Sequence, residues 1–151
     1  YTSIRSVATF LKAIALIHQK PLIPLSNLEC IAYGHSLLYK NDSIIHSAIS
    51  SDIDSEIYYS SYELKNSLLT PLSHEAILAR DDLDSIFVSK RDEIFVGNGW
   101  TDLPDSKKKT SDASTMIELA MARYSASEEY NPNDANPVYL KDTSYKKLND
   151  Q

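Results

Sequence analysis

The sequence predicts an α/β fold, because segments with helical and extended patterns alternate along the chain. Residues 3–18 have a helical pattern, residues 22–25 are a short apolar run, and residues 26–37 are helical again. Further along, residues 43–50 and 55–64 look like two strands joined by a polar turn, and residues 57–62 alternate. With 151 residues, 42% of them hydrophobic and 24% charged, the chain is long enough for one domain or two small ones.

The first helix, residues 3–18, is apolar around more of its circumference than a surface helix requires. The polar residues Arg5, Thr9, Lys12 and Gln19 form one narrow stripe at helical angles. Apolar side chains occupy the remaining arc of about 220°, where a globular surface helix needs little more than about 100°. We expect a second face of this helix to pack on something besides its own core. A central helix buried on all sides is the equally weighted alternative.

The next two elements are marked by their boundary residues. Pro21 closes the first helix, and residues 22–25 are a candidate buried strand. Ser26 is placed to cap the following helix, and Glu29 at its third position completes a capping box. Cys30 falls on an apolar helix face, so we interpret it as a buried structural thiol rather than a nucleophile.

A polar segment at residues 39–43 is the best boundary between two subdomains, because it separates two differently patterned stretches. It divides the chain into residues 1–42 and residues 43–151. The predicted hairpin begins the second subdomain, and its strands are joined by a polar turn at residues 51–54.

The later elements are shorter. We expect a strand near 75–78, a helix over 81–87, a strand over 93–96, a helix over 114–127 and an extended segment over 137–140. The second of these helices is expected to turn inward the side chains of Met116, Ile117, Leu119, Ala120 and Tyr124.

Gly97, Asn98 and Gly99 form a turn just before Trp100 and include two of the three glycines in the chain. Positive φ angles are the plain reason for both glycines. The turn could also be a vestigial phosphate loop. A structural turn is the stronger interpretation, because no Lys or Asp stands in register with it.

Composition excludes several functions. A net charge of −6 and a pI near 5.1 argue against an autonomous nucleic-acid binder. A single cysteine excludes an intrachain disulfide and fits a reducing compartment, so we expect a cytoplasmic protein. Arg5 and Lys12 interrupt the only apolar stretch that approaches a membrane span, so no membrane association is expected.

No catalytic set is evident from the residues. The chain has no P-loop, no Gly-x-Ser-x-Gly elbow and no His/Glu metal helix. The four histidines show no metal-ligand spacing with Cys, Asp or Glu. We therefore predict no catalytic residue, no metal and no cofactor.

Several short stretches together carry a resemblance to a known family. After the opening Tyr-Thr-Ser-Ile-Arg and the long helix comes Pro-Leu-Ile-Pro-Leu-Ser-Asn-Leu-Glu at 21–29. Glu-Ile-Tyr follows at 56–58, Phe-Val-Gly-Asn-Gly-Trp at 95–100, and Pro-Val-Tyr-Leu-Lys at 137–141 with Lys-Lys-Leu at 146–148. Their shared order resembles the TsaB (YeaZ) family of bacterial tRNA threonylcarbamoyladenosine biosynthesis proteins, a glycoprotease-like family.

The chain also departs from that family's pattern. Ser3 stands where the family has Gly, a longer turn including 50–52 replaces Asp-Ala-Arg, and Lys141 replaces Arg. The family's N-terminal strands have no counterpart here. The resemblance therefore covers the later half of the N-terminal subdomain and the whole C-terminal one. Since the chain also lacks an initiator Met and opens directly at a helix, we expect a fragment or a processed product.

The resemblance implies an actin-like (sugar kinase/Hsp70-type) fold and a branch of it that is not itself catalytic. It implies a scaffold that pairs with the homologous catalytic subunit TsaD, with the ATPase TsaE joining and tRNA contacted indirectly through the complex. The family pairs through apolar helices of the N-terminal subdomain, which gives the wide apolar arc a candidate purpose. The implied partner interface comprises Ile4, Val7, Phe10, Leu11, Ile14 and Ile17.

Two other functions stay open. A peptidase or an ATP-dependent phosphotransferase of the same fold is the enzyme alternative. A homodimer through the first helix would cover the same apolar surface.

Overall fold

The structure is a computed structural model that describes residues 2–38, 41–51, 55–66, 68–104, 107–108, 110–126 and 130–140. Its elements are α1 (Thr2–Ile17), α2 (Asn27–Ser36), β1 (Ser43–Ser50), β2 (Glu56–Lys65), β3 (Leu68–Pro71), β4 (Ala76–Ala79), α3 (Arg80–Ser89), β5 (Ile94–Val96), α4 (Ala113–Ser125) and the 3-10 helix η2 (Pro132–Asp134). Among these residues, no helix is both long and apolar enough to cross a membrane.

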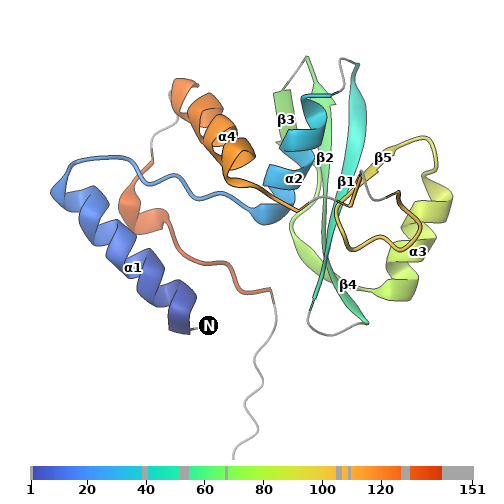
Figure 1. The fold of residues 1–151 in the computed structure, drawn as a ribbon, viewed down its shortest axis with the longest axis horizontal. Helices are drawn as coiled ribbons and strands as arrows, with labels where there is room; N and C mark the ends of the chain where they lie inside the picture. Colours follow the sequence, from blue (N-terminus) through green and yellow to red (C-terminus); the bar gives the residue numbers. More distant parts are fainter. Residues whose placement is uncertain are drawn as a thin grey trace, which may run out of the picture.

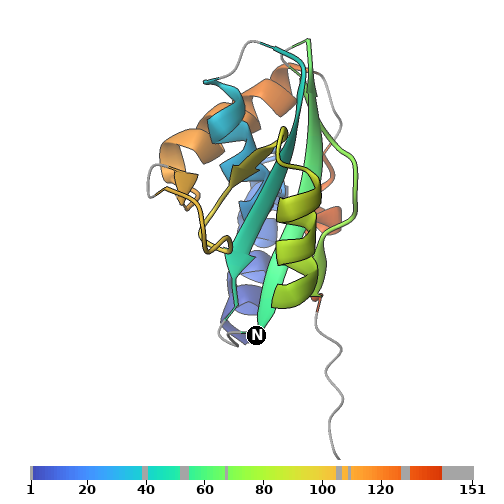
Figure 2. The same cartoon turned by 90° about the vertical axis from the view of Figure 1, so that its right-hand side faces the viewer.

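One mixed sheet forms the centre of the molecule, with strand order β3-β2-β1-β5 and β4 also paired to β2. The predicted hairpin is confirmed: β1 and β2 are antiparallel, in register from Ser43 opposite Leu64 to Ser50 opposite Ile57. β5 joins β1 in parallel. The helices α2 and α3 lie on opposite sides of this sheet (Figures 1 and 2).

Each face of the sheet has its own apolar core, as the alternation of side chains along β1 requires. The face under α2 is packed by Leu28, Ile31, Ala32, Ile45, Tyr62, Leu64 and Val96. The face under α3 is packed by Ala48, Ile57, Leu83, Phe95, Trp100 and Leu103. The second core is rich in aromatic rings, and Phe95 and Trp100 meet edge to face with ring centroids 4.8 Å apart.

The start of α2 matches the capping prediction. The hydroxyl oxygen of Ser26 accepts from the Leu28 N–H at 3.1 Å, which confirms Ser26 as the cap. The Glu29 carboxylate pairs with the guanidinium of Arg123 on α4, and its part in a capping box stays a prediction. α2 precedes the predicted boundary at residue 42 but packs on the sheet that follows it. The division into residues 1–42 and 43–151 stays a prediction, and residues 52–54 of the hairpin turn lie outside the described residues.

Residues 22–25 do not form the strand that we predict. They are an irregular connection between α1 and α2, and within the described part of the chain they pair with no strand. Pro21 and Pro24 lack the N–H that a sheet ladder needs. The carbonyl of Pro24 instead accepts a hydrogen bond from Arg123 at 2.9 Å.

The predicted inner side of α4 is correct for Leu119, which is buried, and wrong for Ile117 and Tyr124, which are exposed. α4 packs on α2 through the side of the helix that carries Thr115 and Arg123. At 100° per residue, Ile117 and Tyr124 fall on the opposite side. The apolar side chains of α4 therefore do not indicate which side of the helix is buried. The position of α2 determines that side.

The end of α1 forces Gln19 into the left-handed region, with φ of 50°. The N–H of Lys20 donates to the carbonyl of Ala15 at 2.9 Å and that of Gln19 to Leu16 at 3.3 Å, which is a Schellman motif. Glycine is usual there, because a Cβ costs about 1–2 kcal/mol in this conformation.

We therefore expect Gln19→Gly to raise the free energy of unfolding by about 1 kcal/mol, after the added freedom of the unfolded chain is subtracted. Urea denaturation measures the change. Gln19→Ala is the matched control and should gain nothing, because alanine keeps the Cβ. Equal stability of the two variants would contradict the strain argument.

Candidate functional site

α1 lies to one side of the molecule and packs on the segment that contains η2 (Figure 1). Lys12 and Arg5 of its polar stripe form hydrogen bonds with residues in and after η2. The Nζ of Lys12 donates to the carbonyl of Asn133 at 3.0 Å and to Oδ1 of Asn136 at 2.6 Å. The Nε of Arg5 donates to the Tyr139 hydroxyl at 3.0 Å, and its guanidinium lies 4.9 Å from the centre of the Tyr139 ring. The polar side of the helix therefore faces the rest of the chain.

The apolar side of α1 is consequently exposed. All the predicted interface residues have large solvent-accessible fractions, from 40% at Ile14 to 76% at Ile17. We call this surface the α1 face, and it consists of Ile4, Val7, Phe10, Leu11, Ile14 and Ile17. Each large apolar side chain left in water forfeits roughly 1.5–3 kcal/mol of burial energy. Its role in binding a partner stays a prediction.

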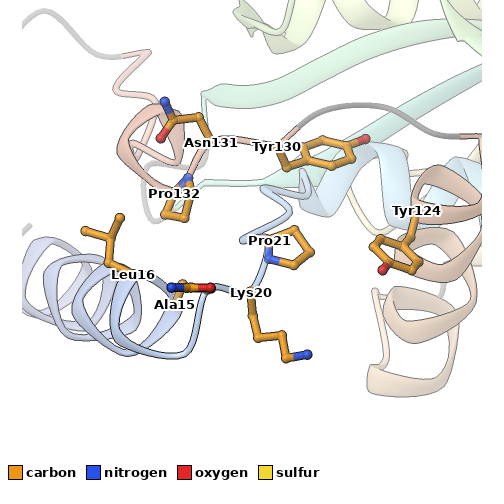
Figure 3. Close-up of a pocket in the computed structure, with 9 residues that line it drawn as sticks. Ala15, Leu16, Lys20, Pro21, Tyr124, Tyr130, Asn131 and Pro132 are labelled. Carbon is orange, nitrogen blue, oxygen red and sulfur yellow. The ribbon is translucent and has the colours of Figure 1, made fainter.

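A groove of about 540 Å³ lies at the C-terminal end of α1. Figure 3 places Leu16 and Pro132 at one end of the groove and Tyr124 of α4 at the other. Its lining residues are Ala15, Leu16, Gln19, Lys20, Pro21, Tyr124, Tyr130, Asn131 and Pro132. Sequence reasoning missed this groove, because residues 15–21 have to meet Tyr124 and residues 130–132, which lie more than 100 positions later in the chain.

The two glycines of the predicted turn are needed for different reasons. Gly97 has φ of +99°, and a Cβ there would lie 2.1 Å from the carbonyl oxygen of Ala48. Gly99 does not have a positive φ, so our explanation is confirmed for Gly97 and wrong for Gly99. A Cβ at Gly99 would lie 2.8 Å from both Ala48 Cβ and Ile57 Cγ2, so close packing against β1 and β2 is the reason.

Contacts within the chain hold this turn. The N–H of Gly97 donates to the carbonyl of Lys107 at 2.8 Å, and the N–H of Gly99 donates to the carbonyl of Ala48 at 3.0 Å. The Asn98 side-chain oxygen accepts from the Ser50 N–H at 3.2 Å, and its carbonyl accepts from the Ser50 hydroxyl at 3.0 Å. These are the bonds of a structural turn that ties β5 to the end of β1. Phosphate binding at this turn stays a prediction.

A buried polar network centres on His46 of β1, which has no exposed surface. Its Nδ1 lies 2.7 Å from the Tyr59 hydroxyl, its Nε2 is hydrogen-bonded to the Glu93 carboxylate, and its ring stacks on Phe95 with centroids 4.9 Å apart. A neutral imidazole with its proton on Nε2 donates to Glu93 and accepts from Tyr59, so both nitrogens are satisfied. Sequence reasoning missed this network, because its members come from three separate strands and turns.

The electrostatics of the network follow from its burial. Burial lowers the pKa of His46 below its usual 6.5, although the hydrogen bond that His46 donates to the Glu93 carboxylate acts in the opposite direction. Burial works to raise the pKa of Glu93, but the hydrogen bond from His46 and the charge and hydrogen bond of Lys90 outweigh it, so the pKa of Glu93 is lowered. Burial raises the pKa of Tyr59. His46 is therefore neutral at pH 7, and its role is to pack and hydrogen-bond inside the core.

The depressed pKa of His46 predicts a loss of stability on mild acidification. Below pH 6.5 the unfolded state takes up a proton on this histidine while the folded state does not, so the free energy of unfolding falls as the pH falls. The slope from one such group approaches about 1.4 kcal/mol per pH unit. Urea denaturation between pH 7.5 and 5.5 measures it, above the range in which Glu93 titrates.

His46→Gln is the matched control, because an amide can donate to Glu93 and accept from Tyr59 without titrating. The other histidines contribute equally to both proteins, so the difference between the two pH profiles isolates His46. Parallel profiles would contradict a neutral His46 in the folded state.

Cys30 offers no nucleophile in this structure. It is fully buried, and burial raises the pKa of its thiol to about 11, so it is protonated at neutral pH. Among the described residues, no group of three or more His, Cys, Asp or Glu side chains is arranged to hold a metal ion.

Comparisons with known proteins give matches at the level of structure. No protein-family model and no curated protein sequence matches the chain. A solved structure described as an uncharacterized protein with similarity to the peptidase YeaZ from Pseudomonas aeruginosa superposes with a TM-score of 0.71 at 21% identity, covering 93% of this chain and 68% of its own. The solved structure of YeaZ from Pseudomonas aeruginosa gives a TM-score of 0.69 at 21% identity, covering 92% of this chain and 69% of its own.

These matches extend over most of the chain. Of the sequence motifs, Lys141 and residues 146–148 lie outside the described residues, whereas the stretch 137–140 is described. At 21% identity the likeness establishes architecture. The chain therefore has the α/β, actin-like fold of the YeaZ structures.

Proposed function

We propose that this protein is a noncatalytic scaffold subunit of the tRNA threonylcarbamoyladenosine modification complex and that it pairs with the catalytic subunit TsaD. The observation that carries the proposal is the α1 face, a set of large apolar side chains exposed along one helix of a YeaZ-like fold. The order of motifs that resembles the TsaB family supports the choice of partner.

The way α1 is held makes its apolar side available. Lys12 and Arg5 fix the polar side of the helix to the segment that contains η2, so the α1 face points away from that contact. The centres of protein interfaces are depleted in charge and enriched in apolar side chains, which is the composition of this face. A partner helix packed along it would recover the burial energy that these side chains otherwise forfeit.

TsaE and tRNA take part through the complex in this proposal. The net charge of −6 disfavours direct contact with a phosphate backbone, which calls for concentrated basic side chains. The modification itself belongs to TsaD, and this chain supports that subunit in the cytoplasm.

Mixing the purified chain with the cognate TsaD tests the proposal. We expect a 1:1 complex in size-exclusion chromatography and a measurable heat of binding in calorimetry. Absence of a complex at tens of micromolar of each protein would overturn it. Light scattering of the chain alone at several concentrations tests the homodimer, and self-association without any binding of TsaD would replace the proposal.

The enzyme alternative rests on a separate observation, since one solved neighbour is described as similar to the peptidase YeaZ. A peptidase assay and an ATP hydrolysis assay with Mg²⁺ on the isolated chain separate the two functions. The scaffold proposal expects background rates in both assays. Robust turnover without a partner, lost on denaturation, would establish an enzyme instead.

A further inference from the structure

We draw no further inference here: the strongest candidate, the exposed apolar stripe of Ile117, Met121 and Tyr124 on α4 beside the groove at the end of α1, carries nothing because no feature of the structure shows what covers it.

Discussion

Replacing Gly97 by alanine is expected to lower the free energy of unfolding by at least about 3 kcal/mol, from backbone strain and overpacking together. The new Cβ would lie 2.1 Å from the carbonyl oxygen of Ala48, and the φ of +99° disfavours any residue with a side chain. Ala48 belongs to β1, which is paired to β2 on one side and to β5 on the other. The strand therefore cannot move away without breaking its ladders. Such a loss is a large part of the 5–15 kcal/mol that stabilises a typical domain.

Thermal unfolding followed by circular dichroism measures this change, and a drop of at least about 6 °C is expected for a chain of this size. Gly34→Ala is the matched control, because it is the same substitution at the remaining glycine of the chain. Gly34 is helical, and the nearest atoms to a Cβ there belong to the Thr115 side chain, at 3.1 and 3.2 Å. The gain in helix propensity offsets that tight contact, so we expect a change within about 1 kcal/mol. Similar losses in both variants would contradict the steric argument at Gly97.

Ile14→Glu is expected to weaken association with TsaD by at least about 30-fold, the effect of losing a central interface residue and burying a charge in its place. Ile14 belongs to the α1 face and is 40% exposed, so a carboxylate at this position can reach solvent in the free chain. Glutamate is a good helix former, and α1 should persist. Isothermal titration calorimetry measures the affinity, and circular dichroism verifies the helix content.

Val88→Glu on α3 is the control for this experiment. Val88 is a similar aliphatic residue, 59% exposed, on the helix that covers the opposite side of the sheet from α2 (Figure 1). We expect it to bind TsaD as the unmodified chain does. Leu11→Glu provides a second test on the α1 face. If both α1 variants bind TsaD with the affinity of the unmodified chain, the interface does not include the α1 face. The proposal that the chain pairs with TsaD would then stand without this interface.

The hairpin shows what a local pattern can predict. Residues 57–62 of β2 alternate, and a polar turn connects β2 to β1, so the pairing of these two strands depends on neighbours in the sequence. The helices α1 and α2 were likewise predictable, since their termini carry their own signals. The Ser26 cap forms through its hydroxyl as expected.

β3 shows what a local pattern leaves out. This four-residue strand, which we do not predict, ends at Pro71 and exists through its pairing with β2. The reverse error arose at residues 22–25, where an apolar run suggested a strand but no neighbouring strand is present in the described part of the chain. A short apolar segment becomes a strand only when a partner strand supplies its hydrogen bonds, and that information is not local.

The candidate site likewise has features that the sequence predicts and features that only the tertiary structure shows. The sequence by itself determined that α1 carries far more apolar surface than one packing face needs, because helical periodicity depends only on residue spacing. Only the tertiary structure decided that the polar stripe faces the chain, through Lys12 and Arg5, and that the α1 face is exposed. It also decided that Gly99 is required by the approach of β1 and β2, and that His46 is buried between Tyr59 and Glu93. The physical reason is that these contacts join residues that are 13 to 134 positions apart in the chain, so they contribute to stability only after the chain has folded.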